Sequence, residues 1–236
     1  LGYRDPQAAL RHLAALTQGF TRQAEIQRQL LPAMLGWFAE GPNPDHGLLA
    51  FRQVSEALGK TSWYLRALRD EGAMAENLAK VLASSRYAVG LLLRAPQTVQ
   101  LLADPAEIRP RTRAEVLAEM RASAGRHAEQ DKAIQSIRAV RREELLRLAM
   151  GDLLGVIDVP SLGVGLSDVT GCTIEAALEV VTRDVLHLPR IAVIALGRWG
   201  GCELSYGSDA DALIVLPDDA GAAGTRAALS AVGTLR

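Results

Sequence analysis

Apolar residues recur at helical spacing through most of the chain and then change to two short continuous runs near its end. From residue 5 to about residue 188, apolar positions are separated by three and four residues, as on one face of a helix. The first such segment opens with Asp5 as a cap and Pro6 at the first helical position. The pattern therefore predicts a helical bundle over residues 1–188.

Three later helices are predicted within this region. One begins near Thr112, after a proline-rich break, and the longest uninterrupted pattern covers residues 127–155. Residues 158–186 predict a short turn and then a helix, with Ser167 or Asp168 as its cap.

The pattern changes after Pro189. The run RIAVIALG and the run DALIVLP are short, apolar and rich in β-branched residues, so each predicts a buried strand. A loop and a helix opening near Thr225 follow them. We therefore place a domain boundary near residue 188 and interpret residues 189–236 as the beginning of an α/β domain.

Composition narrows the classes of function. The net charge of −1 provides no overall positive field that would attract a nucleic acid or an acidic membrane surface, so neither is expected as a partner. The two cysteines, Cys172 and Cys202, have no metal-ligand spacing, and their rarity fits a reducing cytoplasm, the predicted location. The first ten residues lack the basic and apolar regions of a signal peptide, so none is expected there, and no apolar run approaches 18 residues.

Candidate chemistry lies between the two predicted strands. Asp209 and Asp211 stand two residues apart at the start of the second strand, and residues i and i+2 of a strand share a face. Two carboxylates held together repel each other unless a cation lies between them. Mg²⁺ prefers such oxygen ligands together with phosphate, so the pair predicts catalytic, metal-binding aspartates.

Residues before the aspartates suit a triphosphate. Gly200 and Gly201 allow close backbone approach, Ser208 offers a hydroxyl, and Arg198 offers a positive fork for phosphate. We predict these four as the nucleotide-binding residues of a nucleoside-triphosphate site. A D-x-D alone is common in calcium loops and surface turns, and paired glycines also occur at ordinary turns. The combination with two strands is much more specific.

The stretch ALGRWGGCELSYGSDADALIVL resembles the nucleotidyltransferase signature of the glutamine synthetase adenylyltransferases. Arg198 and Trp199 depart from that pattern, where lysine and leucine are usual. Arginine at position 198 keeps the positive charge of lysine but presents it with a different side-chain geometry. The helical region before the signature also resembles this family. The residues that carry the signature are Gly197, Gly200, Gly201, Glu203, Leu204, Ser208, Asp209 and Asp211.

The resemblance implies a polymerase-β-like nucleotidyltransferase domain and a transfer of AMP from ATP to a tyrosine of glutamine synthetase. Members carry two such modules, one attaching AMP and one removing it by phosphorolysis, and this sequence is more similar to the attaching module. A third carboxylate is expected on a later strand, and no strand is predicted after residue 217. We therefore expect this chain to be truncated within its catalytic domain and inactive alone.

Other interpretations remain open. The helical region could serve as a docking module for glutamine synthetase or a PII-type signal protein. The motif could belong to the adenylyl-removing module. An unrelated nucleotidyltransferase acting on a sugar or an antibiotic would fit the aspartates but would leave the long helical region unexplained.

Overall fold

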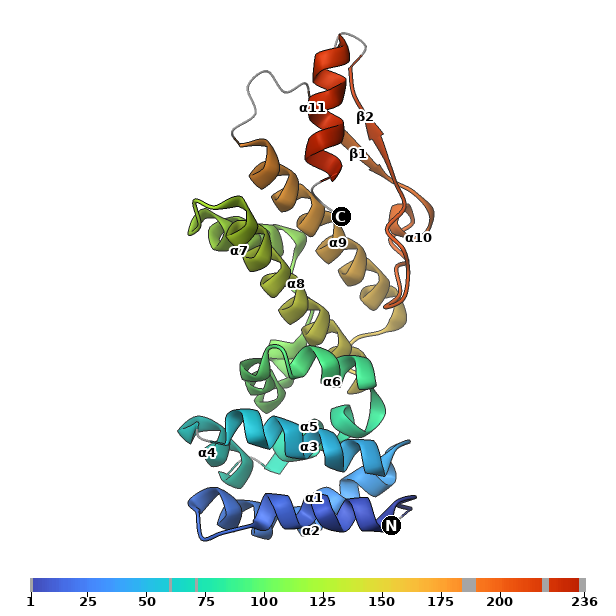
Figure 1. Ribbon diagram of the computed structural model, residues 1–236. Helices are drawn as coiled ribbons and strands as arrows, with labels where there is room; N and C mark the ends of the chain where they lie inside the picture. The colour runs from blue at the N-terminus through green and yellow to red at the C-terminus, as the bar shows by residue number, and fades with distance from the viewer. Residues whose placement is uncertain (1, 60, 71, 184–189, 218–220, 234–236) are drawn as a thin grey trace. The chain divides into compact units, whose positions relative to one another are not determined.

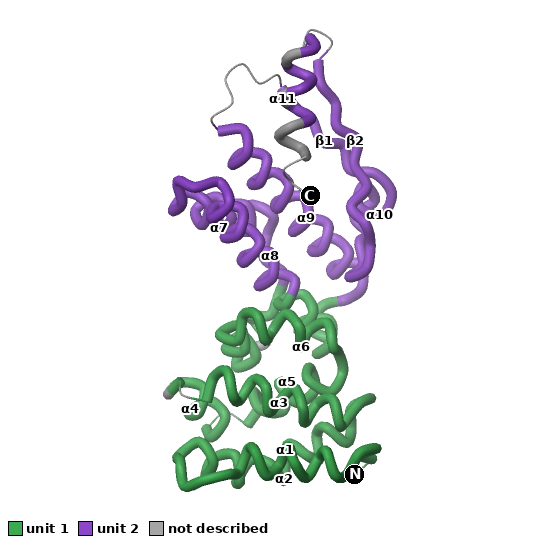
Figure 2. The backbone as a smooth tube through the Cα atoms, in the orientation of Figure 1, with its two compact units in different colours: residues 1–109, 146–157 green, residues 110–145, 158–236 purple. Residues whose placement is uncertain are grey.

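The computed structural model is mainly helical and carries one small sheet (Figure 1), as the sequence predicts. It describes residues 2–59, 61–70, 72–183, 190–217 and 221–233. The chain forms two compact units, residues 1–109 with 146–157 and residues 110–145 with 158–236 (Figure 2). The predicted boundary near residue 188 lies outside the described residues and stays a prediction.

Unit 1 is helical throughout its regular elements. Its core contains Phe38 and Phe51, whose ring centroids lie 6.1 Å apart, and the buried Tyr64, whose hydroxyl pairs with Ser55 Oγ at 3.1 Å. Its elements are α1 (Pro6–Thr17), α2 (Arg22–Glu40), α3 (Pro44–Leu58), α4 (Ser62–Asp70), α5 (Gly72–Ser84), α6 (Arg86–Leu92), the 3₁₀ segments Pro96–Ala103 and Pro105–Ile108, and the end of α8 (Gln130–Leu153).

Unit 2 contains the candidate site. α7 and α9 pack side by side and are joined on their exposed edge by ion pairs, Arg113 with Glu175 at 2.6 Å and Arg121 with Glu179. Its elements are α7 (Arg113–Gly125), the first part of α8, α9 (Val159–Thr182), β1 (Ala192–Ala195), α10 (Gly197–Gly200), β2 (Ala212–Val215) and α11 (Gly221–Gly233).

Helix starts agree with the sequence prediction in two places and not in a third. Asp5 accepts a hydrogen bond from Ala8 N at 2.8 Å, and Thr112 begins α7 with a reciprocal capping box to Glu115. The prediction of a cap at Ser167 or Asp168 is wrong, because both lie inside α9. That helix begins nine residues earlier, where Asp158 Oδ1 accepts from Ser161 N at 2.9 Å.

The two predicted strands exist, but the prediction that they are buried is wrong. β1 and β2 pair antiparallel in a two-stranded sheet, with Ala195 opposite Ala212. Ile194 is 47% exposed and Leu213 52% exposed. An apolar run predicts burial only where both faces of the sheet are covered. Among the described elements, alternate residues of β1 are half-buried and face α9. The residues of β2 are all exposed.

Candidate functional site

The residues between β1 and β2 form a loop whose two ends are held together by a backbone hydrogen bond. Leu196 N donates to Asp211 O at 2.9 Å, which extends the antiparallel ladder one residue beyond Ala195 and Ala212. The short helix α10 follows β1 closely, and Asp211 directly precedes β2. Residues 197–210 therefore connect two fixed strand ends, and all of the predicted site residues lie in or beside this loop.

The glycines of the loop have different reasons to be glycine. A Cβ at Gly200 would lie 2.6 Å from Ala195 O, so no side chain fits there. Gly197 has a φ of +54°, in the left-handed region, and Cys202 adopts a φ of +57° although it carries a side chain. A Cβ at Gly201 would have its nearest neighbour at 3.6 Å, so nothing in the backbone requires glycine there.

Arg198 and Ser208 lie in one polar cluster, joined by Ser205. The Ser205 and Ser208 hydroxyls are 2.8 Å apart, and Ser205 N donates to Ser208 Oγ at 3.0 Å. Arg198 Nη1 donates to Ser205 Oγ at 3.5 Å. Ser205 was not among the predicted site residues. Its position three residues before Ser208 favours such a local hydroxyl turn, which is the only signal that could have found it.

The two predicted catalytic aspartates are exposed and precede β2. The prediction that the second strand begins at Asp209 is wrong, because β2 begins at Ala212. Neither aspartate forms an ion pair with another residue in the described part of the chain. Asp211 Oδ2 lies beside the other end of the loop, 3.4 Å from where a Cβ of Gly197 would be. Their shared use in binding a metal stays a prediction.

The donor set of the loop is compatible with Mg²⁺. Among the described residues, no group of three or more His, Cys, Asp or Glu is arranged to hold a metal by itself. Mg²⁺ is usually held through one or two carboxylates, with the phosphates of the substrate and water completing its shell. Two exposed, unpaired aspartates meet that requirement.

The loop is attached to α9 through a second residue that the sequence analysis missed as a site residue. Trp199 is 8% exposed, and its Nε1 donates to Ser167 O at 3.2 Å. Leu204 is buried as well. At Gly163 of α9, a Cβ would lie 3.0 Å from Cys202 O, so helix and loop backbones touch there.

Comparison with known proteins identifies the family. The family model of glutamate-ammonia ligase adenylyltransferase matches residues 75–233. The chain belongs to this family. Among its relatives are three bifunctional glutamine synthetase adenylyltransferase/adenylyl-removing enzymes. The enzyme of Cutibacterium acnes is 55% identical over 94% of this chain and 22% of the relative. The enzyme of Streptomyces avermitilis is 50% identical over 91% of this chain and 24% of the relative, and that of Mycolicibacterium smegmatis is 45% identical over 94% of this chain and 23% of the relative.

This member of the glutamate-ammonia ligase adenylyltransferase family spans about a quarter of the length of the curated relatives it matches. The resemblance expected from the glycine and aspartate motif is thus confirmed at the level of the family. In the described part of the chain, every helix is too short or too polar to cross a bilayer.

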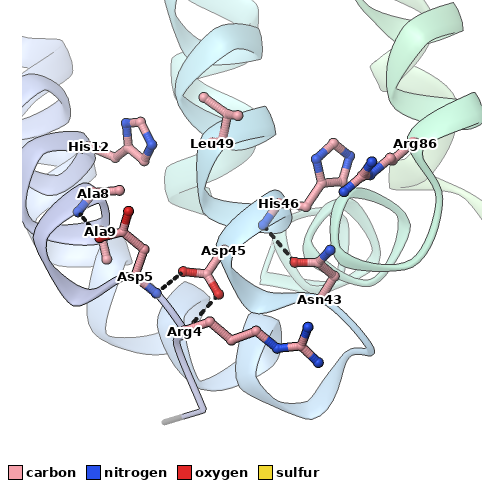
Figure 3. A pocket seen from close by; sticks show the side chains of 10 residues that line it. All are labelled: Arg4, Asp5, Ala8, Ala9, His12, Asn43, Asp45, His46, Leu49 and Arg86. Atoms are coloured by element: carbon pink, nitrogen blue, oxygen red, sulfur yellow. Dashed lines mark hydrogen bonds between the residues drawn. The ribbon is translucent and has the colours of Figure 1, made fainter.

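The chain also has a hollow in unit 1, of about 420 Å³, lined by both charged and apolar residues (Figure 3). Asp45 holds the segment before α1 against α3 by accepting from Arg4 N and Asp5 N, and the bond from Arg4 N lowers the pKa of its carboxyl. Burial lowers the pKa of His12 and of His46, with nearby arginines adding to the effect. Both shifts favour the neutral form of the imidazole at pH 7.

Proposed function

We propose that this chain supplies the ATP-binding part of an adenylyltransferase that transfers AMP to a tyrosine of glutamine synthetase. The main support is the loop between β1 and β2, which brings Arg198 and Ser208 into one polar cluster beside an exposed aspartate pair. The names of the relatives support both the reaction class and glutamine synthetase as the acceptor. A polymerase-β-like domain is part of this proposal.

The residues of the loop would act mainly by positioning and by charge. The Arg198 guanidinium and the Ser208 hydroxyl would donate hydrogen bonds to phosphate oxygens, and the backbone at Gly200 and Gly201 would lie close beneath them. Phosphoryl and nucleotidyl transfers need little covalent help from a protein, so such donors account for much of the catalysis.

Asp209 and Asp211 would hold Mg²⁺. The bound ion would supply charge neutralisation on the phosphates and would favour ionisation of the attacking tyrosine hydroxyl. The tyrosine oxygen then bonds to the α-phosphorus while the bond from that phosphorus to the leaving pyrophosphate breaks. The hydroxyl proton is lost to a base. The products are adenylyl-tyrosine and pyrophosphate.

Calorimetric titration of the chain with ATP and Mg²⁺ tests the proposal. We expect binding that requires Mg²⁺ and that falls at least tenfold, about 1.4 kcal/mol, in Asp209→Asn and in Asp211→Asn. Asp131→Asn removes one carboxylate at the start of α8 and is expected to bind like the unchanged chain. Equal affinity in all four proteins would refute the assignment of the aspartates.

A second experiment separates the two activities of the family. In the longer protein that contains this chain, Asp209→Asn is expected to abolish ATP-dependent modification of glutamine synthetase and to leave phosphate-dependent removal of AMP intact. The opposite result would assign the loop to the removing module. Retained capture of glutamine synthetase or a PII-type protein by a chain that binds no ATP would favour the docking function.

A further inference from the structure

α10 is too short to fix its own orientation. It has four residues, and an isolated turn of helix is unstable because its nucleation is unfavourable. Arg198 and Gly200 flank Trp199 and are exposed, whereas the Trp199 indole is buried. The direction in which Arg198 points therefore depends on what holds Trp199.

The indole is held by both polar and apolar contacts with α9. Trp199 Nε1 donates to Ser167 O at 3.2 Å, and the Ser167 hydroxyl turns back to Gly163 O at 2.8 Å. The indole also lies against Gly171, where an added Cβ would meet ring atoms at 3.9 and 4.0 Å. Leucine, usual at position 199 in the resembled signature, has no N–H to donate.

The backbone of the loop lies on the same helix. A Cβ at Gly163 would be 3.0 Å from Cys202 O and 3.2 Å from Glu203 Cα, closer than side chains normally approach. Glu203 N donates to Arg198 O at 2.8 Å and Cys202 N to Trp199 O at 3.1 Å, so a shift at residues 202 and 203 would be passed to α10.

We propose that Trp199 is a positioning residue, and that the indole and Gly163 of α9 together set the orientation in which Arg198 and the Ser205–Ser208 pair meet the phosphates. This rests on the proposed function. α9 is then a platform for the nucleotide loop as well as a packing element of unit 2. Trp199 acts only through its neighbours and does not touch the reacting atoms.

Three substitutions test the proposal in the titration with ATP and Mg²⁺. Trp199→Phe keeps a ring but removes the donor, and we expect affinity to fall about 3- to 10-fold, as loss of one buried hydrogen bond allows. Trp199→Leu is expected to lower the affinity further. Gly163→Ala should also weaken binding although alanine is the better helix former, because its Cβ would displace the loop.

Gly171→Ala is the matched control, since the same substitution on the same helix makes only ordinary contacts with the indole. It is expected to retain affinity. Melting temperatures, measured in parallel, separate positioning from stability: Gly163→Ala should lose affinity without losing stability. In the longer enzyme, Trp199→Phe should raise the KM for ATP more than it lowers kcat.

Fluorescence adds a readout independent of activity. With Trp37→Phe and Trp63→Phe, Trp199 is the sole tryptophan, and we expect its emission to shift when ATP and Mg²⁺ bind. If the unchanged chain binds no ATP, the proposed function fails. If it binds and the Trp199 and Gly163 variants bind equally well, or all affinities simply follow melting temperature, the positioning role is wrong.

Discussion

Two neighbouring glycines of the loop have different surroundings. A Cβ at Gly200 would lie 2.6 Å from the carbonyl oxygen of Ala195, whereas one at Gly201 would have its nearest neighbour at 3.6 Å. Gly201 also has an ordinary φ of −83°. Both glycines were predicted to bind phosphate, but only at Gly200 does the backbone itself exclude a side chain.

Alanine substitutions separate these two cases. We expect Gly200→Ala to lower the free energy of unfolding of unit 2 by about 1–3 kcal/mol, because the strand end and α10 must move apart. Gly201→Ala should stay within about 0.5 kcal/mol of the unchanged chain. Urea unfolding checks both values. A Gly200→Ala protein as stable as Gly201→Ala would contradict the close contact.

Single residues of the site could be predicted only in part. Asp209, Asp211 and Ser208 are recognisable from their spacing to the glycines. Ser205 and Trp199 are not, because their importance comes from how the loop folds. The hydroxyl of Ser205 lies between Arg198 and Ser208, and the indole reaches a carbonyl 32 residues earlier in the chain.

At the scale of elements, α9 is the instructive case. Its helical residues include Gly163 and Gly171, in a segment for which a short turn and then a helix capped at Ser167 or Asp168 were predicted. Glycine is a poor helix former, but here Gly163 makes room for the loop backbone. The contact that explains this glycine involves Cys202, and no local pattern could have predicted it.

The position of the cap gives an element-scale prediction. Asp158→Ala should destabilise α9, while Asp158→Asn should keep most of the cap and Asp168→Ala should leave the helix start unchanged. Hydrogen bonds from Ser161 lower the pKa of Asp158. The stabilisation is therefore present above its unfolded pKa and is lost as the pH falls through the folded one.

Melting followed by circular dichroism at pH 7 and at pH 3 checks this prediction. The unchanged chain should exceed Asp158→Ala in melting temperature at pH 7, and the difference should shrink at pH 3. A difference that is the same at both pH values would show that the charge of Asp158 contributes nothing to the cap.

Helical periodicity and caps made most of the helices predictable, and apolar runs made both strands predictable. Burial of the strands was not predictable, because an apolar run does not tell which element covers it. Ile194 and Leu213 belong to such runs and are about half exposed. Covering a sheet face requires long-range packing, which is decided by residues far away in the chain.

At the scale of the whole molecule, titratable groups combine to make stability fall with acidity in two stages. His12 and His46 have lowered pKa values in the folded chain. As the pH falls through about 6.5, the unfolded chain therefore binds protons at these residues more readily than the folded chain does, and stability falls. The carboxyls of Asp45, Glu115 and Asp158, also with lowered pKa values, produce the second stage below about pH 4. Burial raises the pKa of Asp168, which opposes this second stage.

The first stage depends on the surroundings of the two imidazoles. His46 is partly buried beside Arg86, and His12 is partly buried and faces Arg52 and Arg11, whose repulsion outweighs the attraction of Asp5 and Glu56. The Nδ1 atom of His12 and the Nε2 atom of His46 are buried without a hydrogen-bond partner among the described residues. Protonation of either imidazole would therefore add a charge that no hydrogen bond at these atoms stabilises.

A double variant, His12→Gln with His46→Gln, isolates the first stage. We expect the urea midpoint of the unchanged chain to fall between pH 7.5 and pH 5.5, as stability is lost while the unfolded histidines become protonated. The double variant should show a much smaller fall over the same range and should retain the second stage near pH 4. An equal slope in the double variant and the unchanged chain would mean that these imidazoles do not couple protonation to folding.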